Sequence, residues 1–229
     1  MKGKTKMFKI DNENFDIEYA FLEAYESSAG ARRLIFDLEI GAKRKDFLFH
    51  SHEIHLDFDI RLEIEKLLAI YPDQIKKWTD IAGKIITWRE PEWDEPESDY
   101  PEKALLYVLD HEKVYDGRAE LKNVNDKLFI HIKAFVDIFV GDKCYKRTPL
   151  EIETELHFNG ILCGVKPSEE DIAILGISGA WEDRYIEKAK PYFNVDDFEF
   201  IENINGASIM MPGRMQERFY DRAKNGRYD

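Results

Sequence analysis

Three histidines fall within six residues of this sequence and could bind a metal ion. His50, His52 and His55 stand in the segment HSHEIH, and Asp57 follows two residues later. Zinc accepts imidazole and carboxylate ligands, and three protein ligands plus a water molecule make a catalytic site. One hypothesis is therefore a metal-dependent hydrolase that uses His50, His52, His55 and Asp57.

The spacing H-x-H-x-x-H resembles the H-x-H-x-D-H motif of the metallo-β-lactamase family over six residues. Ile54 stands where that family has its aspartate, so we reject the assignment. If 47–60 is one strand, His50 and His52 point to one face while His55 and Asp57 point to the other. The simpler interpretation is a hairpin turn at His50–His52 followed by a strand, with no metal and no cofactor.

Carboxylates are a second possible source of function. The proline-rich segment 89–103 carries seven of them between Glu90 and Glu102, together with two aromatic residues. A concentrated negative field speeds the encounter with a basic partner, and aromatic residues are favoured at binding hot spots. The predicted partner-binding residues are Trp93, Asp94, Glu95 and Tyr100, with Glu151, Glu153 and Glu155 as a secondary patch.

Sequence motifs of common enzymes are missing. There is no G-x-S-x-G, no G-x-x-x-x-G-K-[ST] and no G-x-G-x-x-G, which lowers the odds of an enzyme without excluding one. A further alternative is carbohydrate binding, through Trp88, Trp93 and Tyr100.

Composition limits the class of protein. The 229 residues include 33 Lys+Arg and 46 Asp+Glu, for a net charge of −13, which argues against nucleic-acid binding. No run approaches the roughly 18 apolar residues of a membrane helix, and no signal-peptide core follows the N-terminal lysines. Two cysteines are too few for a disulfide framework, so we expect free thiols and a cytoplasmic location without membrane association.

Alternating apolar and polar residues predict strands with one solvated face, which is typical of antiparallel sheet. The fold class predicted is α+β, a predominantly antiparallel β-sheet (meander or sandwich-like) with about four to five short helices. The predicted strands are 15–25, 34–40, 54–60, 128–140 and 151–159, and the predicted helices are 61–70, 72–83, 168–175, 181–190 and 213–225. Three dipeptides predict turns. They are Asp116-Gly117, Asn159-Gly160 and Asn205-Gly206.

The chain is predicted to be one globular domain over 1–229. The alternative is a hairpin-plus-helices unit over 1–84, an acidic loop or linker over 85–103 and a β-rich unit over 104–229. The leading functional hypothesis is a non-catalytic acidic protein-binding module that recognises a basic protein. Its most concrete form is an immunity-type inhibitor of a basic toxin or enzyme; the oligomeric state is left open.

Overall fold

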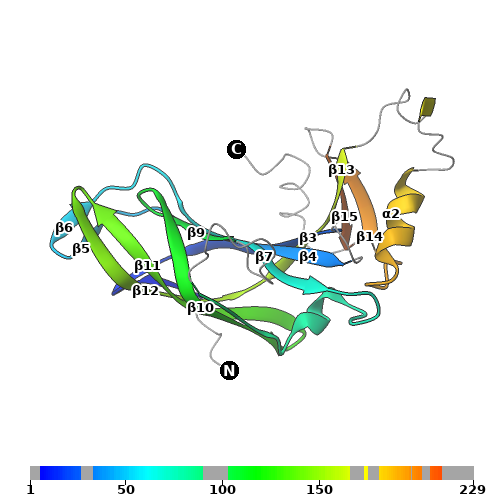
Figure 1. Ribbon diagram of the computed structural model, residues 1–229, viewed down its shortest axis with the longest axis horizontal. Helices are drawn as coiled ribbons and strands as arrows, with labels where there is room; N and C mark the ends of the chain where they lie inside the picture. Colours follow the sequence, from blue (N-terminus) through cyan, green and yellow to red (C-terminus); the bar gives the residue numbers. More distant parts are fainter. Residues whose placement is uncertain are drawn as a thin grey trace. The chain divides into compact units, whose positions relative to one another are not determined.

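The computed structural model describes residues 6–26, 33–89, 103–165, 173–174, 181–196, 198–202 and 207–212 (Figure 1). Two compact units share the chain. Unit 1 comprises Met1–Leu22, Phe36–Leu68 and Ile81–His157, and unit 2 comprises Glu23–Ile35, Ala69–Asp80 and Phe158–Asp229. Both units are assembled from three separate stretches of sequence. The prediction of one domain, or of a division in the 85–103 segment, stays a prediction.

Strands account for 66% of the residues that the structure describes. They are β1 (Met7–Ile10), β2 (Glu13–Phe15), β3 (Ile17–Glu26), β4 (Leu34–Ala42), β5 (Phe47–Phe49), β6 (His52–Ile54), β7 (Ile60–Ile70), β8 (Ile85–Trp88), β9 (Lys103–Tyr107), β10 (His111–Val124), β11 (Lys127–Val140), β12 (Lys143–Glu155), β13 (His157–Val165), β14 (Phe198–Glu202) and β15 (Ala207–Pro212). The described residues also form the 3-10 helix η1 (Trp78–Ile81) and the helix α2 (Trp181–Ala189).

Long antiparallel strands build the sheet of unit 1. In the sheet order, the unit 1 parts of β3, β4 and β7 are followed by β9, β10, β11, β12, β1 and β2. The strand β10 pairs with β9 over its first residues and with β8 from Gly117 onward. The short hairpin β5–β6 forms a separate two-stranded sheet.

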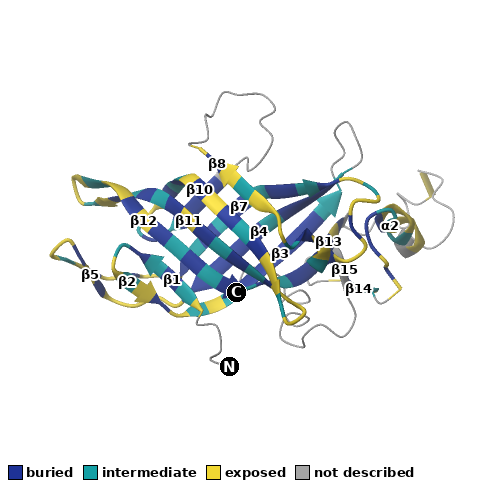
Figure 2. Ribbon diagram, turned by 90° about the horizontal axis from the view of Figure 1, so that it is seen from below, coloured by how far each residue is buried: buried dark blue, intermediate teal, exposed yellow. Residues whose placement is uncertain are grey.

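Side chains of one parity form the core of unit 1. On β11, every even-numbered residue from Leu128 to Ile138 is buried, whereas none of the odd-numbered residues is (Figure 2). The strands β10 and β12 alternate in the same way beside it. We call the partly solvated face of β10, β11 and β12 the outer face.

Unit 2 contains the remaining parts of β7, β4 and β3, followed in the sheet order by β13, β15 and β14, together with α2. Its core is aromatic: Phe158 stacks on Trp78 at 5.5 Å between ring centroids and contacts Phe193 edge-on at 5.9 Å. The rings of Phe193 and Phe198 stack at 6.1 Å.

The predicted antiparallel β structure is confirmed, but the fold class with four to five helices is wrong. Residues 61–70, predicted as a helix, form β7, whose alternation is interrupted at Lys66 by a left-handed backbone (φ 52°). Because of that break, the consecutive residues Leu67 and Leu68 are both buried, and the spacing of apolar residues in β7 resembles that of a helix. Of 72–83 only η1 is helical, because Asp80 accepts the backbone N–H groups of Lys76 and Lys77 and holds a single turn.

The remaining helix predictions have mixed outcomes. The helix over 181–190 is confirmed as α2. Of 168–175 only residues 173–174 are described, both helical, and 213–225 lies outside the described residues. Among the part of the chain that the structure describes, α2 is the one α-helix longer than a turn. No described helix is long and apolar enough to cross a membrane.

Strand predictions were more accurate. Strands over 15–25, 34–40 and 128–140 match β3, β4 and β11 closely, and 151–159 is divided at Leu156 between β12 and β13. The strand over 54–60 is wrong in its middle, where 55–59 is a loop. Two predicted turns are also wrong: Asp116-Gly117 lies inside β10 and Asn159-Gly160 inside β13. The dipeptide Asn205-Gly206 lies outside the described residues, although β14 and β15 pair as expected.

Candidate functional site

The histidine cluster lies at the tip of the β5–β6 hairpin. His50 and Ser51 adopt left-handed backbones (φ 46° and 68°), which makes them the two-residue turn between these strands. The imidazole of His50 stacks on Tyr145 of β12 at 4.4 Å, and His52 contacts the same ring at 6.0 Å. His55 instead pairs with Asp46 at 3.1 Å.

The predicted metal ligands are therefore not gathered into one site. Within the described ranges, the chain holds no group of three or more histidine, cysteine, aspartate or glutamate side chains placed to bind a metal. The predicted turn at His50–His52 is confirmed, and its imidazoles pack against an aromatic ring.

Tyr145 anchors this hairpin to β12, because Phe49 also contacts its ring edge-on at 5.1 Å. We expect Tyr145→Ala to release the β5–β6 hairpin and to lower the free energy of unfolding by about 2 kcal/mol. Hydrogen exchange of residues 47–54 should then accelerate. Exchange as slow as in the wild type would show that the hairpin is held by other contacts.

The predicted partner-binding residues fall into two groups. Trp93, Asp94, Glu95 and Tyr100 lie outside the described residues. Glu151, Glu153 and Glu155 follow one another on the outer face of β12, as their alternation predicted.

Basic side chains of the neighbouring strand β11 contact this acidic row. Glu151 lies 2.9 Å from His131 Nε2 and 3.2 Å from Lys133 Nζ, and Lys127 Nζ lies 2.9 Å from Glu155. Hydrogen bonds from His131 and then from Lys133 hold the pKa of Glu151 below its usual range. Glu151 is therefore ionised at neutral pH, and Lys133 and Lys127 reduce the local negative field of the row.

On the outer face, two β-bulges flank the strand β11, one on β10 and one on β12. On β10, Asp116 and Gly117 together stand opposite Ala134, between the pairs Tyr115↔Phe135 and Arg118↔Lys133. On β12, two residues that include Arg147 stand opposite Asp137. Both Asp116 (φ 46°) and Arg147 (φ 54°) adopt a left-handed backbone, which is costly for a side chain such as arginine.

These bulges place one arginine across the central strand. The guanidinium of Arg147 lies over the ring of Phe135, with Cζ 4.1 Å from the centroid, and Nη1 reaches Asp116 Oδ2 at 2.8 Å. The Arg147 backbone N–H donates to Asp137 Oδ1 at 2.9 Å and to the Tyr115 hydroxyl oxygen at 3.1 Å. We call Tyr115, Asp116, Phe135, Asp137 and Arg147 the arginine platform.

The platform is suited to binding more than to proton transfer. The Tyr115 hydroxyl donates to Asp137 Oδ1 at 2.5 Å, and desolvation followed by this interaction raises the pKa of Tyr115 to about 12. The phenol therefore stays protonated at neutral pH. The Arg147 side chain is held at both ends yet remains 57% exposed, so it presents a fixed cation on an aromatic ring.

A buried carboxyl group lies on the opposite side of the same strands. Glu112 of β10 is only 6% exposed and accepts the backbone N–H of Phe139. Its Oε1 has no hydrogen-bond partner among the described residues. Desolvation, and to a smaller extent the charges of Asp110 and Asp137, raise the pKa of Glu112 to about 7.

A second polar and aromatic cluster of unit 1 lies on β3, β4, β7 and β9. Glu63 lies 3.1 Å from Arg61 Nε and accepts the Tyr107 hydroxyl at 2.9 Å, while Arg61 lies 4.4 Å above the Tyr107 ring. The Tyr19 hydroxyl donates to the buried Glu39 at 2.7 Å. The carboxylates of Glu63 and Glu39 raise the pKa of Arg61 despite its partial desolvation, so Arg61 stays charged between them.

One of the three aromatic residues predicted to bind carbohydrate, Trp88, is not available to a ligand. Trp88 of β8 is 8% exposed, and its indole N–H donates to the backbone oxygen of Val114 at 3.0 Å. A ring in this position cannot stack on a sugar. The other two residues of that hypothesis, Trp93 and Tyr100, lie outside the described residues.

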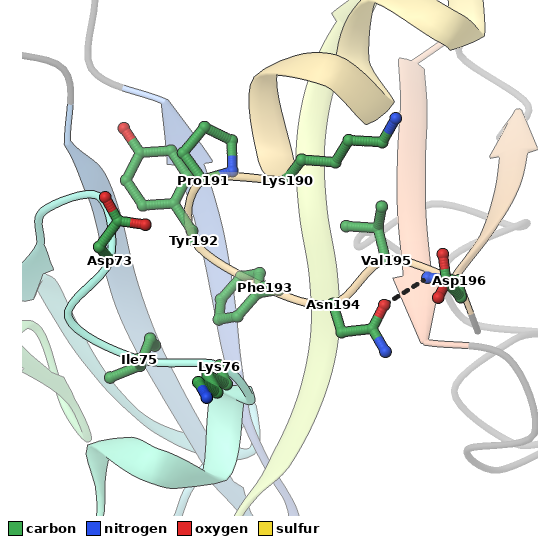
Figure 3. A pocket seen from close by; sticks show the side chains of 10 residues that line it. All are labelled: Asp73, Ile75, Lys76, Lys190, Pro191, Tyr192, Phe193, Asn194, Val195 and Asp196. Carbon is green, nitrogen blue, oxygen red and sulfur yellow. Dashed lines mark hydrogen bonds between the residues drawn. The ribbon is translucent and has the colours of Figure 1, made fainter.

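Unit 2 contains a pocket of about 500 Å³ between the segments 73–76 and 190–196 (Figure 3). Two backbone hydrogen bonds join these segments, from Asp73 N to Pro191 O and from Asn194 N to Lys76 O. Buried Ile75 and Phe193 line it together with Lys76 and Lys190. Of the charged residues that line it, Lys190 is engaged by Glu187.

The arginine platform was not predicted from the sequence. Its signal was Asp116-Gly117 inside an alternating run, which we interpreted as a turn although the same dipeptide also suits a bulge. Comparisons with protein-family models, with curated proteins and with solved structures found no match to this chain.

Proposed function

We propose that this chain is a non-catalytic protein-binding module and that the arginine platform contacts its partner. The observation that carries the proposal is Arg147, which is fixed in a left-handed backbone on Phe135 and is still largely exposed. Arginine and tyrosine are enriched at binding hot spots, and a side chain already held in place loses little entropy on binding.

The partner that we propose is a basic protein that presents a carboxylate or a backbone carbonyl oxygen to Arg147. The net charge of −13 attracts a cationic partner over a long range. Glu151, Glu153 and Glu155 lie on the same face as the platform and can exchange their intrachain cations for those of a partner. An immunity-type inhibitor of a basic toxin or enzyme remains the concrete form of this proposal. Both cysteines are free thiols, which is compatible with a cytoplasmic location.

Capture from the lysate of the native organism tests the proposal. Wild type, Phe135→Ala and Arg147→Ala would be immobilised through the same terminus, with Lys84→Ala as a matched control outside the platform. We expect the wild type and the control to retain the same basic protein. We expect the platform variants to bind it about 30-fold more weakly, the loss typical of a hot-spot residue.

Salt gives a second readout of the same experiment. Raising the salt concentration should slow association with the captured protein, because steering by opposite charges is screened. Circular dichroism would confirm that the variants are folded. Equal retention by wild type and platform variants, or capture that does not respond to salt, would contradict the proposal.

A further inference from the structure

The buried carboxyl group of Glu112 lies beside the strand that carries the arginine platform. Its neighbours on β10 and β11 are apolar and fully buried, Val114 at 0% and Ile138 at 1% exposure. One carboxyl oxygen accepts the Phe139 N–H, and no described residue hydrogen-bonds the other. A neutral carboxyl tolerates this position far better than a charged one, because a buried charge without a partner is costly.

Charged groups around Glu112 make ionisation still less favourable. Asp110 lies in the turn before β10 and Asp137 lies on β11, and both act on Glu112 through their negative charges. On β9, the residue paired with Glu112 is Leu106, which carries no charge. None of the groups that shift the pKa of Glu112 is a cation.

One of these two carboxylates belongs to the platform. Asp137 Oδ1 accepts both the Arg147 N–H and the Tyr115 hydroxyl, so it fixes the bulge that positions Arg147. A second negative charge close to Asp137, on a carboxylate that needs water, opposes the closed arrangement of β10 and β11 at this point.

From this geometry we infer that Glu112 is a protonation switch that regulates the arginine platform. The platform is closed and ordered while Glu112 is neutral, and it opens more often once Glu112 loses its proton. The biological meaning of the switch rests on the proposed function, since a loosened platform would bind its partner less well. The switch itself is a property of this chain and can be measured without a partner.

The sign follows from proton linkage. In an opened, solvated state Glu112 has an ordinary pKa of 4.5, whereas in the closed state its pKa is about 7. The closed state therefore holds the proton more tightly between these values. Opening becomes more favourable as pH rises from about 4.5 to 7 and then levels off.

Amide hydrogen exchange of the full chain tests the switch. Opening would be measured for the segments 112–118 and 136–148 between pH 5 and 8, after correction for the intrinsic pH dependence of exchange. For the wild type we expect corrected opening to increase at least tenfold from pH 5 to 7 and to change little above pH 7. In Glu112→Gln, which is neutral at every pH, the corrected profile should be flat.

Glu120→Gln is the matched control, because Glu120 lies on the same strand with a partly exposed carboxylate that is paired with Arg118 and Lys122. It should keep the wild-type increase. If Glu112→Gln retains the increase, or if the wild type shows none, the switch is refuted. That result would not contradict the proposed function, because partner capture is measured at a single pH and depends on Phe135 and Arg147. Conversely, a failed capture experiment would not contradict the exchange result.

Discussion

Replacing Gly117 with alanine is expected to lower the free energy of unfolding by about 3 kcal/mol, the upper range for adding a methyl group to a packed core. Gly117 stands directly opposite Trp88 in the register of β10 and β8. A β-carbon at Gly117 would lie 2.1 Å from two atoms of the Trp88 ring, far inside van der Waals contact. The ring or the bulge must therefore move.

Trp88 has little freedom to make room. It is 8% exposed, and its indole N–H is committed to the Val114 oxygen. Displacing the ring would break that hydrogen bond and leave a buried acceptor less well satisfied. Displacing Gly117 instead would shift Asp116, which pairs with Arg147 across β11. We therefore expect Gly117→Ala to weaken partner capture as well as stability.

Chemical denaturation of Gly117→Ala beside Gly141→Ala measures this effect. Gly141 lies in the β11–β12 turn with φ 58°, and a β-carbon at this position would meet no atom within 4 Å, so its substitution carries only backbone strain. We expect that control to lose about 1 kcal/mol. Equal losses at the two positions would show that the Trp88 contact is not the cause.

The alternation of apolar and polar side chains made most strands predictable. Where that alternation is interrupted, the sequence predicted a helix in place of a strand. The even face of β11 was recognisable because it has no interruption over its whole length. The strand β7 was mistaken for a helix because one left-handed residue, Lys66, changes the parity of its apolar side chains. That conformation depends on Asp37, whose carboxylate accepts the Lys66 N–H from 29 residues away, and a local pattern does not contain this information.

The candidate site was less predictable than the strands for a related reason. Glu151, Glu153 and Glu155 could be placed on one face by parity alone, but their cations come from β11, which only the register reveals. Arg147 and Asp116 are 31 residues apart and meet because bulges on separate strands flank the same part of β11. The residue types show which side chains carry charge, whereas the pairing of β10, β11 and β12 determines which of those charges come into contact.

Glu112→Gln is expected to make the chain more stable at pH 8 and to leave stability nearly unchanged at pH 4.5. The pKa of Glu112 is raised by folding from 4.5 to about 7, so the folded chain holds its proton more tightly than the unfolded chain. The stability that Glu112 contributes is therefore present below pH 4.5 and is lost as pH rises through about 7. Its full conversion corresponds to about 3.4 kcal/mol, and we expect about 2 kcal/mol because opening around the ionised carboxylate relieves part of its desolvation.

Urea denaturation of both proteins at several pH values measures this difference. The gap between them should open between pH 4.5 and 7 and then stay constant at about 2 kcal/mol. Glu120→Gln should act in the opposite direction, because hydrogen bonds from Lys122 and then Arg118 lower the pKa of Glu120 in the folded chain. A gap that is already fully present at pH 4.5 would assign the effect of Glu112→Gln to packing, since proton linkage contributes little to the difference at that pH.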